Sequence, residues 1–118
     1  MVKSLYHYKA FVVSVYDGDT VTVDIDLGLH VTLKKEKIRL ARINAPELRG
    51  EEHDEGIKSR DFLRSLVIEK NIFLETIKDR KGKYGRYLGE LWAQDEDEKY
   101  FNVNDELVKK GFAVYKKY

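Results

Sequence analysis

The chain has 118 residues, of which 42% are hydrophobic, and it contains one proline and no cysteine. Its length fits a single compact domain with a modest core, and the lack of cysteine excludes disulfide bonds and thiolate metal sites. The 22 Lys and Arg residues nearly balance the 21 Asp and Glu residues, giving a net charge of +1. Any phosphate-binding site must therefore come from local clustering of basic residues.

The first two strands are predicted from composition and from alternation. Residues 5–16 are rich in Tyr, Phe and Val, which favour strands. Across residues 21–33 every odd position is apolar, and every even position is Thr, Asp, Gly or His. This period of two indicates strands with one buried face, and the glycine inside the run indicates a hairpin.

The hairpin loop is predicted from the parity of this alternation. A two-residue loop would pair odd positions with even ones and turn one apolar face to solvent. A three-residue loop at 26–28 keeps odd positions opposite one another and gives the glycine the position that needs positive φ. Ile25 is then expected to face Leu29. Val23 is expected to face Val31 in the same way.

Strand character returns at residues 36–43 and is expected to end before Pro46, because proline has no N–H to donate to a strand ladder. Residues 52–69 are predicted to form a helix, since apolar residues recur there at helical spacing. The acidic residues at the start of this segment and Lys70 at its end suit the helix dipole.

The last third of the chain predicts two more strands and a second helix. The strands are expected at residues 71–77 and 86–93, and the acidic run at 95–98 is expected to be an exposed loop. A short helix is predicted at 103–110, with an asparagine as its N-cap and a glycine just after its end. The tail that follows is expected to be extended.

This order of elements predicts a mainly β fold with helices, of the α+β class. It has five strands, one longer helix after the third strand and one short helix after the fifth. Five strands are enough to close a small OB-fold barrel with a helix over one open end. No internal repeat divides the sequence, so one domain is expected over residues 1–118.

The stretch YDGDTVTV at residues 16–23 raises the first functional question. Asp-Gly is a common turn pair, so these residues alone favour an acidic turn. The alternative is part of a metal site, because Asp17 and Asp19 can point the same way and hard cations such as Ca²⁺ take carboxylate and carbonyl oxygens. From this stretch alone, both interpretations stay open.

Two further stretches carry groups that suit phosphate chemistry. RLARINAPE at 39–47 contains Arg39 and Glu47, and KYGR at 83–86 ends in Arg86. Taken alone, each is typical of a solvated strand or loop. In combination with the aspartates they are the groups needed to attack a phosphodiester. A metal ion and guanidinium groups neutralise the phosphorus oxygens, and a carboxylate orients or deprotonates water.

In combination, these motifs resemble the staphylococcal nuclease family. DGDT at 17–20, RLARINAPE at 39–47, KYGRYLG at 83–89 and GFAVY at 111–115 occur in the family's order and spacing. The resemblance implies an OB-fold barrel with helices. It also implies Ca²⁺-dependent hydrolysis of DNA and RNA, in which water attacks phosphorus and the 5′-oxygen leaves to give 3′-phosphate products.

The resemblance implies a role for each residue of a metal site. Asp19 resembles a direct Ca²⁺ ligand, and Asp17 resembles an outer-shell partner. The side chain of Asn44 and the backbone carbonyl of Ala45 stand where the family has its other ligands. Glu47 resembles the residue to which the family assigns the general base.

The resemblance also implies contacts to the substrate. Arg39 and Arg86 resemble the pair that clamps the reacting phosphate. Lys83 and Tyr84 resemble groups that bind a neighbouring phosphate. Tyr115 is a candidate for stacking against a base.

The chain departs from the family at Asn44, where the family has Asp. Asn offers one neutral oxygen in place of an anionic carboxylate, and Ca²⁺ affinity depends on ligand charge, so a weaker metal site is expected. The departure leaves one alternative to a nuclease, which is a non-catalytic nucleic-acid-binding module on the same barrel.

DNA and RNA are the expected partners, with a monomer as the default state. No apolar run approaches transmembrane length, so no membrane partner is expected. The start of the chain, MVKSLYHYKA, lacks the apolar region of a signal peptide. We expect a cytoplasmic location if the chain is complete, and secretion if a signal peptide has been removed.

Overall fold

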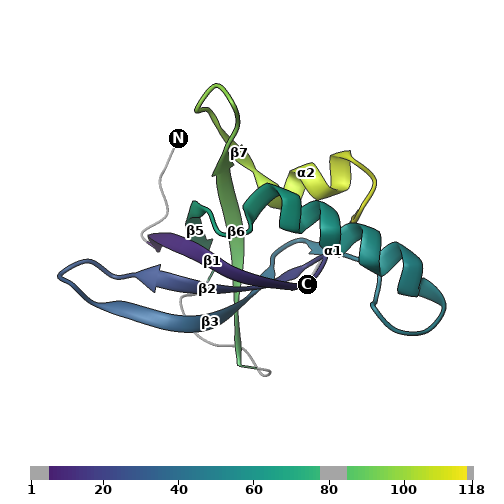
Figure 1. Ribbon diagram of the computed structural model, residues 1–118, viewed down its shortest axis with the longest axis horizontal. Coiled ribbons are helices and arrows are strands. Elements are labelled where there is room, and N and C mark those ends of the chain that lie inside the picture. The colour runs from purple at the N-terminus through teal and green to yellow at the C-terminus, as the bar shows by residue number, and fades with distance from the viewer. Residues whose placement is uncertain (1–5, 78–84, 117–118) are drawn as a thin grey trace.

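A closed barrel of five strands forms the body of the molecule in the computed structural model, which describes residues 6–77 and 85–116 (Figure 1). Antiparallel pairing joins the strands in the order β3-β2-β1-β5-β6, and a parallel pairing of β3 with β6 closes the barrel. The predicted OB-fold class is therefore confirmed. The barrel strands are β1 (His7–Asp17), β2 (Thr20–Asp26), β3 (Thr32–Leu40), β5 (Asn71–Thr76) and β6 (Arg86–Gln94).

The remaining elements are attached to one side and one end of the barrel. Helices α1 (His53–Val67) and α2 (Val103–Lys109) contact each other at the end away from the β2–β3 hairpin (Figure 1). Strand β7 (Tyr100–Asn102) pairs with β6, and the short strands β4 (Ile43–Asn44) and β8 (Val114–Tyr115) pair with each other. A 3-10 turn at Gly50–Glu52 leads into α1. No helix in the described part of the chain has the length and apolarity needed to cross a membrane.

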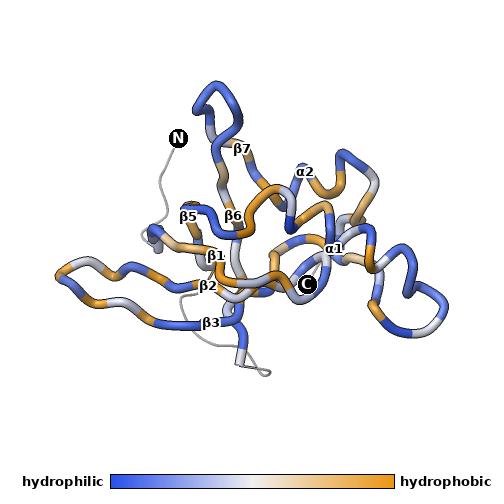
Figure 2. The backbone as a smooth tube through the Cα atoms, viewed as in Figure 1, coloured by the Kyte–Doolittle hydropathy of each residue, from blue (hydrophilic) through white to orange (hydrophobic). Residues whose placement is uncertain are grey.

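One hydrophobic core joins the barrel to both helices. The apolar residues of the strands and helices face a shared interior, whereas the turn between β6 and β7 is hydrophilic (Figure 2). Burial of this apolar surface is the main favourable contribution to folding. Fully buried members come from eight elements: Val12, Val21, Val23, Ile38, Leu40, Ile43, Leu63, Val67, Leu74, Leu91, Val103 and Leu107.

The predicted three-residue hairpin loop is wrong. Ile25 pairs with Leu33 and not with Leu29, and the loop covers residues 27–31. Three consecutive loop residues, beginning at Gly28, have positive φ. The N–H of Leu27 donates a hydrogen bond of 2.9 Å to the carbonyl of Val31 across the loop. Only the positive φ of Gly28 was predicted correctly. The apolar odd positions of the loop are exposed, with Leu29 at 95%.

The register of β2 with β3 shifts in the next stretch as well. Val23 pairs with Glu36, where the sequence predicted Val31, because the loop is longer than predicted and the ladder is also irregular between Val23 and Ile25. Lys35 has a φ of +55° at this irregularity. An argument from parity cannot anticipate such a bulge, since one extra residue reverses the facing of every later side chain.

Other boundaries differ less. The strand predicted at 36–43 begins earlier and ends at Leu40, and a turn at Arg42, with a φ of +67°, separates it from β4. The second helix is capped as predicted, because the Asn102 side chain accepts a hydrogen bond of 2.8 Å from the backbone N–H of Asp105. Gly111 follows this helix with a φ of +83°.

Candidate active site

A tight turn between β1 and β2 carries the two aspartates. Asp17 pairs with Thr20, and the Asp17 carboxylate accepts a hydrogen bond of 3.1 Å from the backbone N–H of Asp19. A Cβ added at Gly18 would lie 2.7 Å from the Cβ atoms of both Ala45 and Ser59. The turn therefore packs directly against the segment after β4 and against α1, and only glycine allows this approach.

Asp19 joins the turn to the second motif. Its side chain is almost fully buried, and its Oδ2 accepts a hydrogen bond of 2.9 Å from the backbone N–H of Ala45. The same oxygen lies 3.3 Å from Nη2 of Arg39, and the Thr20 hydroxyl donates to Oδ1 at 3.3 Å. Two sequence motifs that lie about twenty residues apart along the chain thus meet at one carboxylate.

Arg39 is held at the centre of this cluster. It lies opposite Thr20 on the outer face of β3, and its Nη1 donates to the carbonyl of Leu40 at 2.6 Å. Its Nη2 donates to Oδ1 of Asn44 at 3.3 Å in addition to the ion pair with Asp19. The structure therefore brings together four of the predicted site residues, Asp19, Arg39, Asn44 and Ala45.

The surroundings of Asp17 disfavour the charged form of its carboxylate. Burial, followed by the negative charge of Asp19, raises the pKa of Asp17 from 3.8 to about 6. A cation bound beside the two carboxylates would favour the charged form of Asp17 and counter this rise.

The oxygen donors around the turn fit a hard cation. Within the described ranges, 6–77 and 85–116, no group of three or more His, Cys, Asp or Glu residues could hold a metal ion. The donors at hand are the carboxylates of Asp17 and Asp19, the amide oxygen of Asn44 and backbone carbonyls. Ca²⁺ accepts this mixture, but with fewer anionic ligands it binds less tightly.

A hollow of about 570 Å³ on the outer face of the barrel adjoins the aspartate turn. Asp17 lines it together with Lys37 and Arg86. Arg86 pairs with Lys37 across β6 and β3, and Lys37 is two residues, or about 6.6 Å along the strand, from Arg39. The two predicted arginines therefore project from the same face, and Arg86 lines the space next to Asp17.

Glu47 joins the site through its backbone. Its side chain is exposed and makes no hydrogen bond or ion pair with any residue in the described ranges. A Cβ added at Gly56 would overlap the carbonyl oxygen of Glu47, so the segment after β4 lies against the first turn of α1. This packing fixes where the Glu47 backbone sits, while its carboxylate faces solvent.

The remaining predicted substrate contacts lie elsewhere or outside the described residues. The Tyr115 hydroxyl donates to Oδ1 of Asp105 at 2.9 Å, which raises the pKa of the tyrosine. The Tyr115 ring lies 5.8 Å from the guanidinium carbon of Arg42. Lys83 and Tyr84 lie outside the residues that the structure describes.

Sequence reasoning missed the ion-pair network that fixes the connection to β4. Arg42 binds Glu90 with two hydrogen bonds of 2.8 Å and contacts Asp105 at 2.9 Å. The hydrogen bonds to Glu90 raise the pKa of Arg42. The Arg42 carbonyl accepts a hydrogen bond of 2.7 Å from the N–H of Lys116, which ties β8 to the same point. The available signal was a glutamate among the mostly apolar residues 87–93.

Asn104 supports the same connection from α2. Its side chain is fully buried and donates to the carbonyls of Ala41 at 3.0 Å and Gly89 at 3.1 Å. Its Oδ1 accepts a hydrogen bond of 3.2 Å from the N–H of Leu91. The turn before β4 is therefore held from both β6 and α2, and this turn positions Asn44 and Ala45.

Comparison with known proteins agrees with this geometry. A family model described as "Staphylococcal nuclease homologue" matches residues 37–118, which include the end of β3, the Asn44 segment and Arg86. The chain belongs to this family. A nuclease-type function is thus supported at the level of the family.

Three relatives of this family member illustrate the similarity. The thermonuclease of Staphylococcus hyicus is 31% identical over 110 residues, covering 91% of this chain and 59% of the relative. The thermonuclease of Staphylococcus intermedius is 33% identical over 107 residues, covering 88% and 57%. An uncharacterized protein of Methanocaldococcus jannaschii is 28% identical over 128 residues, covering 91% and 58%. The chain therefore spans less than three-fifths of the length of these relatives.

Proposed function

We propose that the chain is a Ca²⁺-dependent nuclease that hydrolyses DNA and RNA to 3′-phosphate products. The observation that carries this proposal is the convergence of Asp19, Arg39, Asn44 and Ala45, beside a hollow lined by Asp17 and Arg86. These are the groups that phosphodiester hydrolysis requires, and they come from separate segments of the chain.

Four residues would hold the cation. Asp19, the amide oxygen of Asn44 and the carbonyl of Ala45 would bind it directly, with Asp17 in the outer shell. When bound, the ion supplies positive charge that stabilises the phosphoryl oxygens in the transition state. Two carboxylates close together in a partly buried turn, where burial and then the charge of Asp19 raise the pKa of Asp17, support this assignment.

The arginines bind and polarise the phosphate. Arg39 shares its Nη2 between Asp19 and Asn44, and its guanidinium would be free to turn toward the substrate phosphate if these oxygens held a cation. Arg86 projects from the same outer face on the neighbouring strand. Guanidinium groups stay charged at all working pH values and match two phosphate oxygens at once, so together they neutralise the pentacoordinate phosphorus.

Glu47 takes the proton of the attacking water. Its exposed carboxylate is free of contacts with the described residues, so it can orient water without first breaking an ion pair. The water oxygen bonds to phosphorus as the bond from phosphorus to the 5′-oxygen breaks. The 5′-oxygen leaves and takes a proton from solvent, and the phosphate stays on the 3′ side. Lys83, Tyr84 and Tyr115 remain proposed substrate contacts.

The products test this proposal directly. A single-stranded oligonucleotide labelled at its 5′ end is incubated with the protein in Ca²⁺ or in EDTA, and the fragments are treated with a 3′-phosphatase. We expect cleavage only with Ca²⁺, and fragments whose mobility changes after phosphatase treatment. Cleavage in EDTA, or fragments that carry 3′-hydroxyl groups, would contradict the proposed chemistry.

Asn44 favours one second candidate, a non-catalytic nucleic-acid-binding module. The turn has only two carboxylates near the amide of Asn44, so the metal site lacks one anionic ligand. A module of this kind would form a complex that survives EDTA, and the DNA would stay intact in millimolar Ca²⁺. A complex without turnover under these conditions would replace the nuclease proposal with this one.

A further inference from the structure

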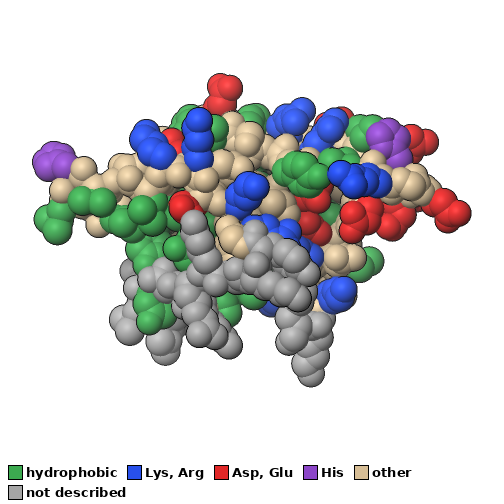
Figure 3. All heavy atoms as spheres, turned by 90° about the horizontal axis from the view of Figure 1, so that it is seen from below, with side chains coloured by type: hydrophobic (Ala, Val, Ile, Leu, Met, Phe, Trp, Pro, Cys, Tyr) green, Lys and Arg blue, Asp and Glu red, His purple; other side chains and the backbone are tan. Residues whose placement is uncertain are grey.

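Two carboxylates are buried in the described part of the chain, and only one of them belongs to the proposed metal site. Charged side chains otherwise stand out over the surface, as Figure 3 shows for one face of the molecule. The buried residues are Asp19 and Glu90, each at 7% exposure. Burial of a charge is costly unless the charge is paired. Glu90 has no part in the proposed chemistry, so its burial calls for another explanation.

Glu90 lies where β3 leaves the barrel. The parallel ladder of β3 with β6 ends at the pairing of Leu40 with Gly89, and the N–H of Ala41 donates one more hydrogen bond of 2.8 Å to the Gly89 carbonyl. The chain then turns away at Arg42, whose guanidinium reaches back to both carboxylate oxygens of Glu90 at 2.8 Å. This side-chain pair continues the link between the two strands after their ladder has ended.

The backbone at this turn adopts a conformation that arginine disfavours. Arg42 has a φ of +67°, in the left-handed region, where the Cβ of a non-glycine residue crowds the following carbonyl. Six non-glycine residues in the described ranges have positive φ, and Arg42 alone among them anchors its side chain in ion pairs. Conformations of this kind persist where the surrounding structure holds them, and they gather at functional sites.

The residues after the turn are two of the proposed metal ligands, Asn44 and Ala45. Asn44 lies two residues, or up to about 7 Å, beyond Arg42, so a backbone rotation of about 20° at the turn would move it by about 2 Å. Its strand, β4, has only two residues and pairs with β8. The N–H of Lys116, at the end of β8, donates to the Arg42 carbonyl at 2.7 Å. Because β8 is tied to the same arginine, a shift at residue 42 is passed on to the ligands.

We propose that Arg42 and Glu90 are positioning residues of the metal site. Their bidentate pair holds residue 42 in the left-handed conformation. That conformation places Asn44 and Ala45 around the Asp19 carboxylate. A guanidinium that meets both oxygens of a carboxylate fixes orientation as well as distance. The inference rests on the proposed function for the role of Asn44 and Ala45 as ligands.

The alternative is that the ion pair only stabilises the fold, and a glycine at position 42 separates the two roles. Without its partner, Arg42 should populate the left-handed conformation about tenfold less, whereas glycine adopts it without an anchor. Glu90→Gln removes the ion pair at almost unchanged size. We expect Glu90→Gln to disturb the ligand segment, and Arg42→Gly added to it to restore that segment. If the pair only stabilised the fold, the second change would bring no recovery.

The hydrogen bond of 2.9 Å from the Ala45 N–H to Oδ2 of Asp19 gives a readout that needs neither metal nor substrate. Amide hydrogen exchange followed by NMR measures it, with the Leu74 amide in the barrel core as the reference for global unfolding. We expect Glu90→Gln to speed exchange at Ala45 relative to Leu74 about tenfold. The double variant Arg42→Gly/Glu90→Gln should return this ratio to its wild-type value.

Ca²⁺ affinity, measured by calorimetry, should follow the exchange. Affinity scales with the fraction of molecules that hold the binding-competent conformation, so Glu90→Gln should weaken Ca²⁺ binding about tenfold. The double variant with Arg42→Gly should recover it. Loss of stability alone would lower the midpoint of urea unfolding and leave the Ca²⁺ affinity of the folded protein unchanged.

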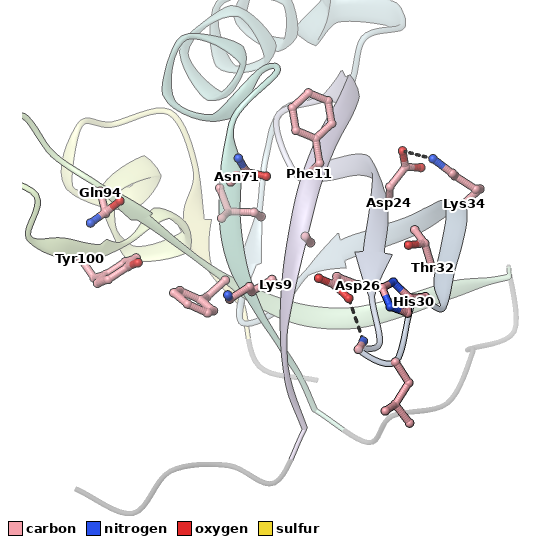
Figure 4. A pocket seen from close by; sticks show the side chains of 15 residues that line it. Lys9, Phe11, Asp24, Asp26, His30, Thr32, Lys34, Asn71, Gln94 and Tyr100 are labelled. Atoms are coloured by element: carbon pink, nitrogen blue, oxygen red, sulfur yellow. Dashed lines mark hydrogen bonds and ion pairs between the residues drawn. The ribbon is translucent and has the colours of Figure 1, made fainter.

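The β2–β3 hairpin supplies matched controls, because it holds both an ion pair and a left-handed residue away from the aspartate turn. Figure 4 shows Asp24 and Lys34 facing each other in the wall of a surface hollow, with 3.6 Å between Oδ2 and Nζ. Lys35 has a φ of +55°. Asp24→Asn removes a paired carboxylate charge, and Lys35→Gly relieves a left-handed backbone. Neither should change the exchange at Ala45 or the affinity for Ca²⁺.

Wild-type exchange at Ala45 in Glu90→Gln would overturn the proposal, as would a double variant that stays as disturbed as the single one. If Glu90→Gln does not fold, Arg42→Lys takes its place, because lysine keeps the charge but cannot meet both oxygens in one plane. Wild-type exchange in Arg42→Lys would then overturn the proposal.

The exchange measurement also separates this inference from the proposed function. If the wild type neither binds Ca²⁺ nor cleaves, but exchange at Ala45 rises in Glu90→Gln and recovers with Arg42→Gly, the positioning stands and the proposed function fails. If the wild type cleaves in Ca²⁺ and exchange at Ala45 does not respond, the proposed function stands and the inference fails.

Discussion

Substitution of Asn44 by Asp should tighten Ca²⁺ binding. In the structure the Asn44 amide oxygen lies 3.3 Å from Nη2 of Arg39, at the edge of the cluster that holds Asp19. Asn44→Asp replaces a neutral ligand oxygen with a charged one and leaves the side-chain size almost unchanged. Its effect therefore reports on the ligand role of position 44 with little change in packing.

The size of the effect follows from two opposing contributions. A polar contact with a charged group contributes about 1.5–3 kcal/mol, and one with a neutral group about 0.5–1.5 kcal/mol. By this measure, the added charge at position 44 strengthens Ca²⁺ binding by about 1.5 kcal/mol. In the metal-free protein the new carboxylate also pairs with Arg39, and this exposed pair offsets about 0.5 kcal/mol of that gain. The remainder of about 1 kcal/mol corresponds to about fivefold tighter binding.

Calorimetric titration with Ca²⁺ measures this change. Asn71→Asp is the matched control, because Asn71 is an exposed residue at the start of β5 and the substitution alters the net charge equally. We expect fivefold tighter binding for Asn44→Asp and no change for Asn71→Asp. Unchanged or weaker binding by Asn44→Asp, or equal tightening in both variants, would remove Asn44 from the metal site.

Three further outcomes are expected. Glu47→Gln should lower kcat about a hundredfold or more without weakening DNA binding in EDTA. Glu51→Gln, in the same acidic run, is the control and should change neither kcat nor DNA binding. A parallel loss of rate and binding in Glu47→Gln would count against its role as general base. Gly18→Ala should lower the free energy of unfolding, measured in urea titrations, by about 1–3 kcal/mol, because the new Cβ would lie 2.7 Å from Ala45 and Ser59. An unchanged free energy of unfolding would disprove this close packing. Since the pKa of Asp17 is raised, its favourable contribution to stability is fully present below pH 3.8 and is lost as the pH rises through about 6. In EDTA above pH 6, Asp17→Asn should therefore be more stable than the wild type by about 1–2 kcal/mol after solvent screening, and equal stabilities there would refute the raised pKa.

The barrel could be predicted because its strands and caps are local patterns. Alternation located β2, and the side chain of Asn102 marked the start of α2. The prediction of the hairpin loop failed because the alternation of apolar residues continues into the loop beyond the barrel. Leu29 is exposed there and does not pack against the core. The bulge at Lys35 then reversed the parity on which the prediction depended.

The candidate site, like the fold, could be predicted only in part from the sequence. The grouping of Asp19, Arg39 and Asn44 was expected from the resemblance of the motifs to the family, and the structure brings these side chains together. The pairing of Arg42 with Glu90 depends on the parallel register of β3 with β6, across 48 residues of sequence. No local pattern encodes that register, because it is set by closure of the whole barrel.

A DNA digestion assay with purified protein tests the central claim, that this cluster cleaves phosphodiester bonds, most directly. Wild-type protein, Arg86→Ala and Arg64→Ala are compared in Ca²⁺ and in EDTA, with Arg64 chosen as an exposed arginine on α1 away from the site. We predict Ca²⁺-dependent cleavage by the wild type and Arg64→Ala, and its loss in Arg86→Ala, which also excludes a contaminating nuclease. Absence of cleavage by the wild type in millimolar Ca²⁺, or equal cleavage by Arg86→Ala, would contradict the claim.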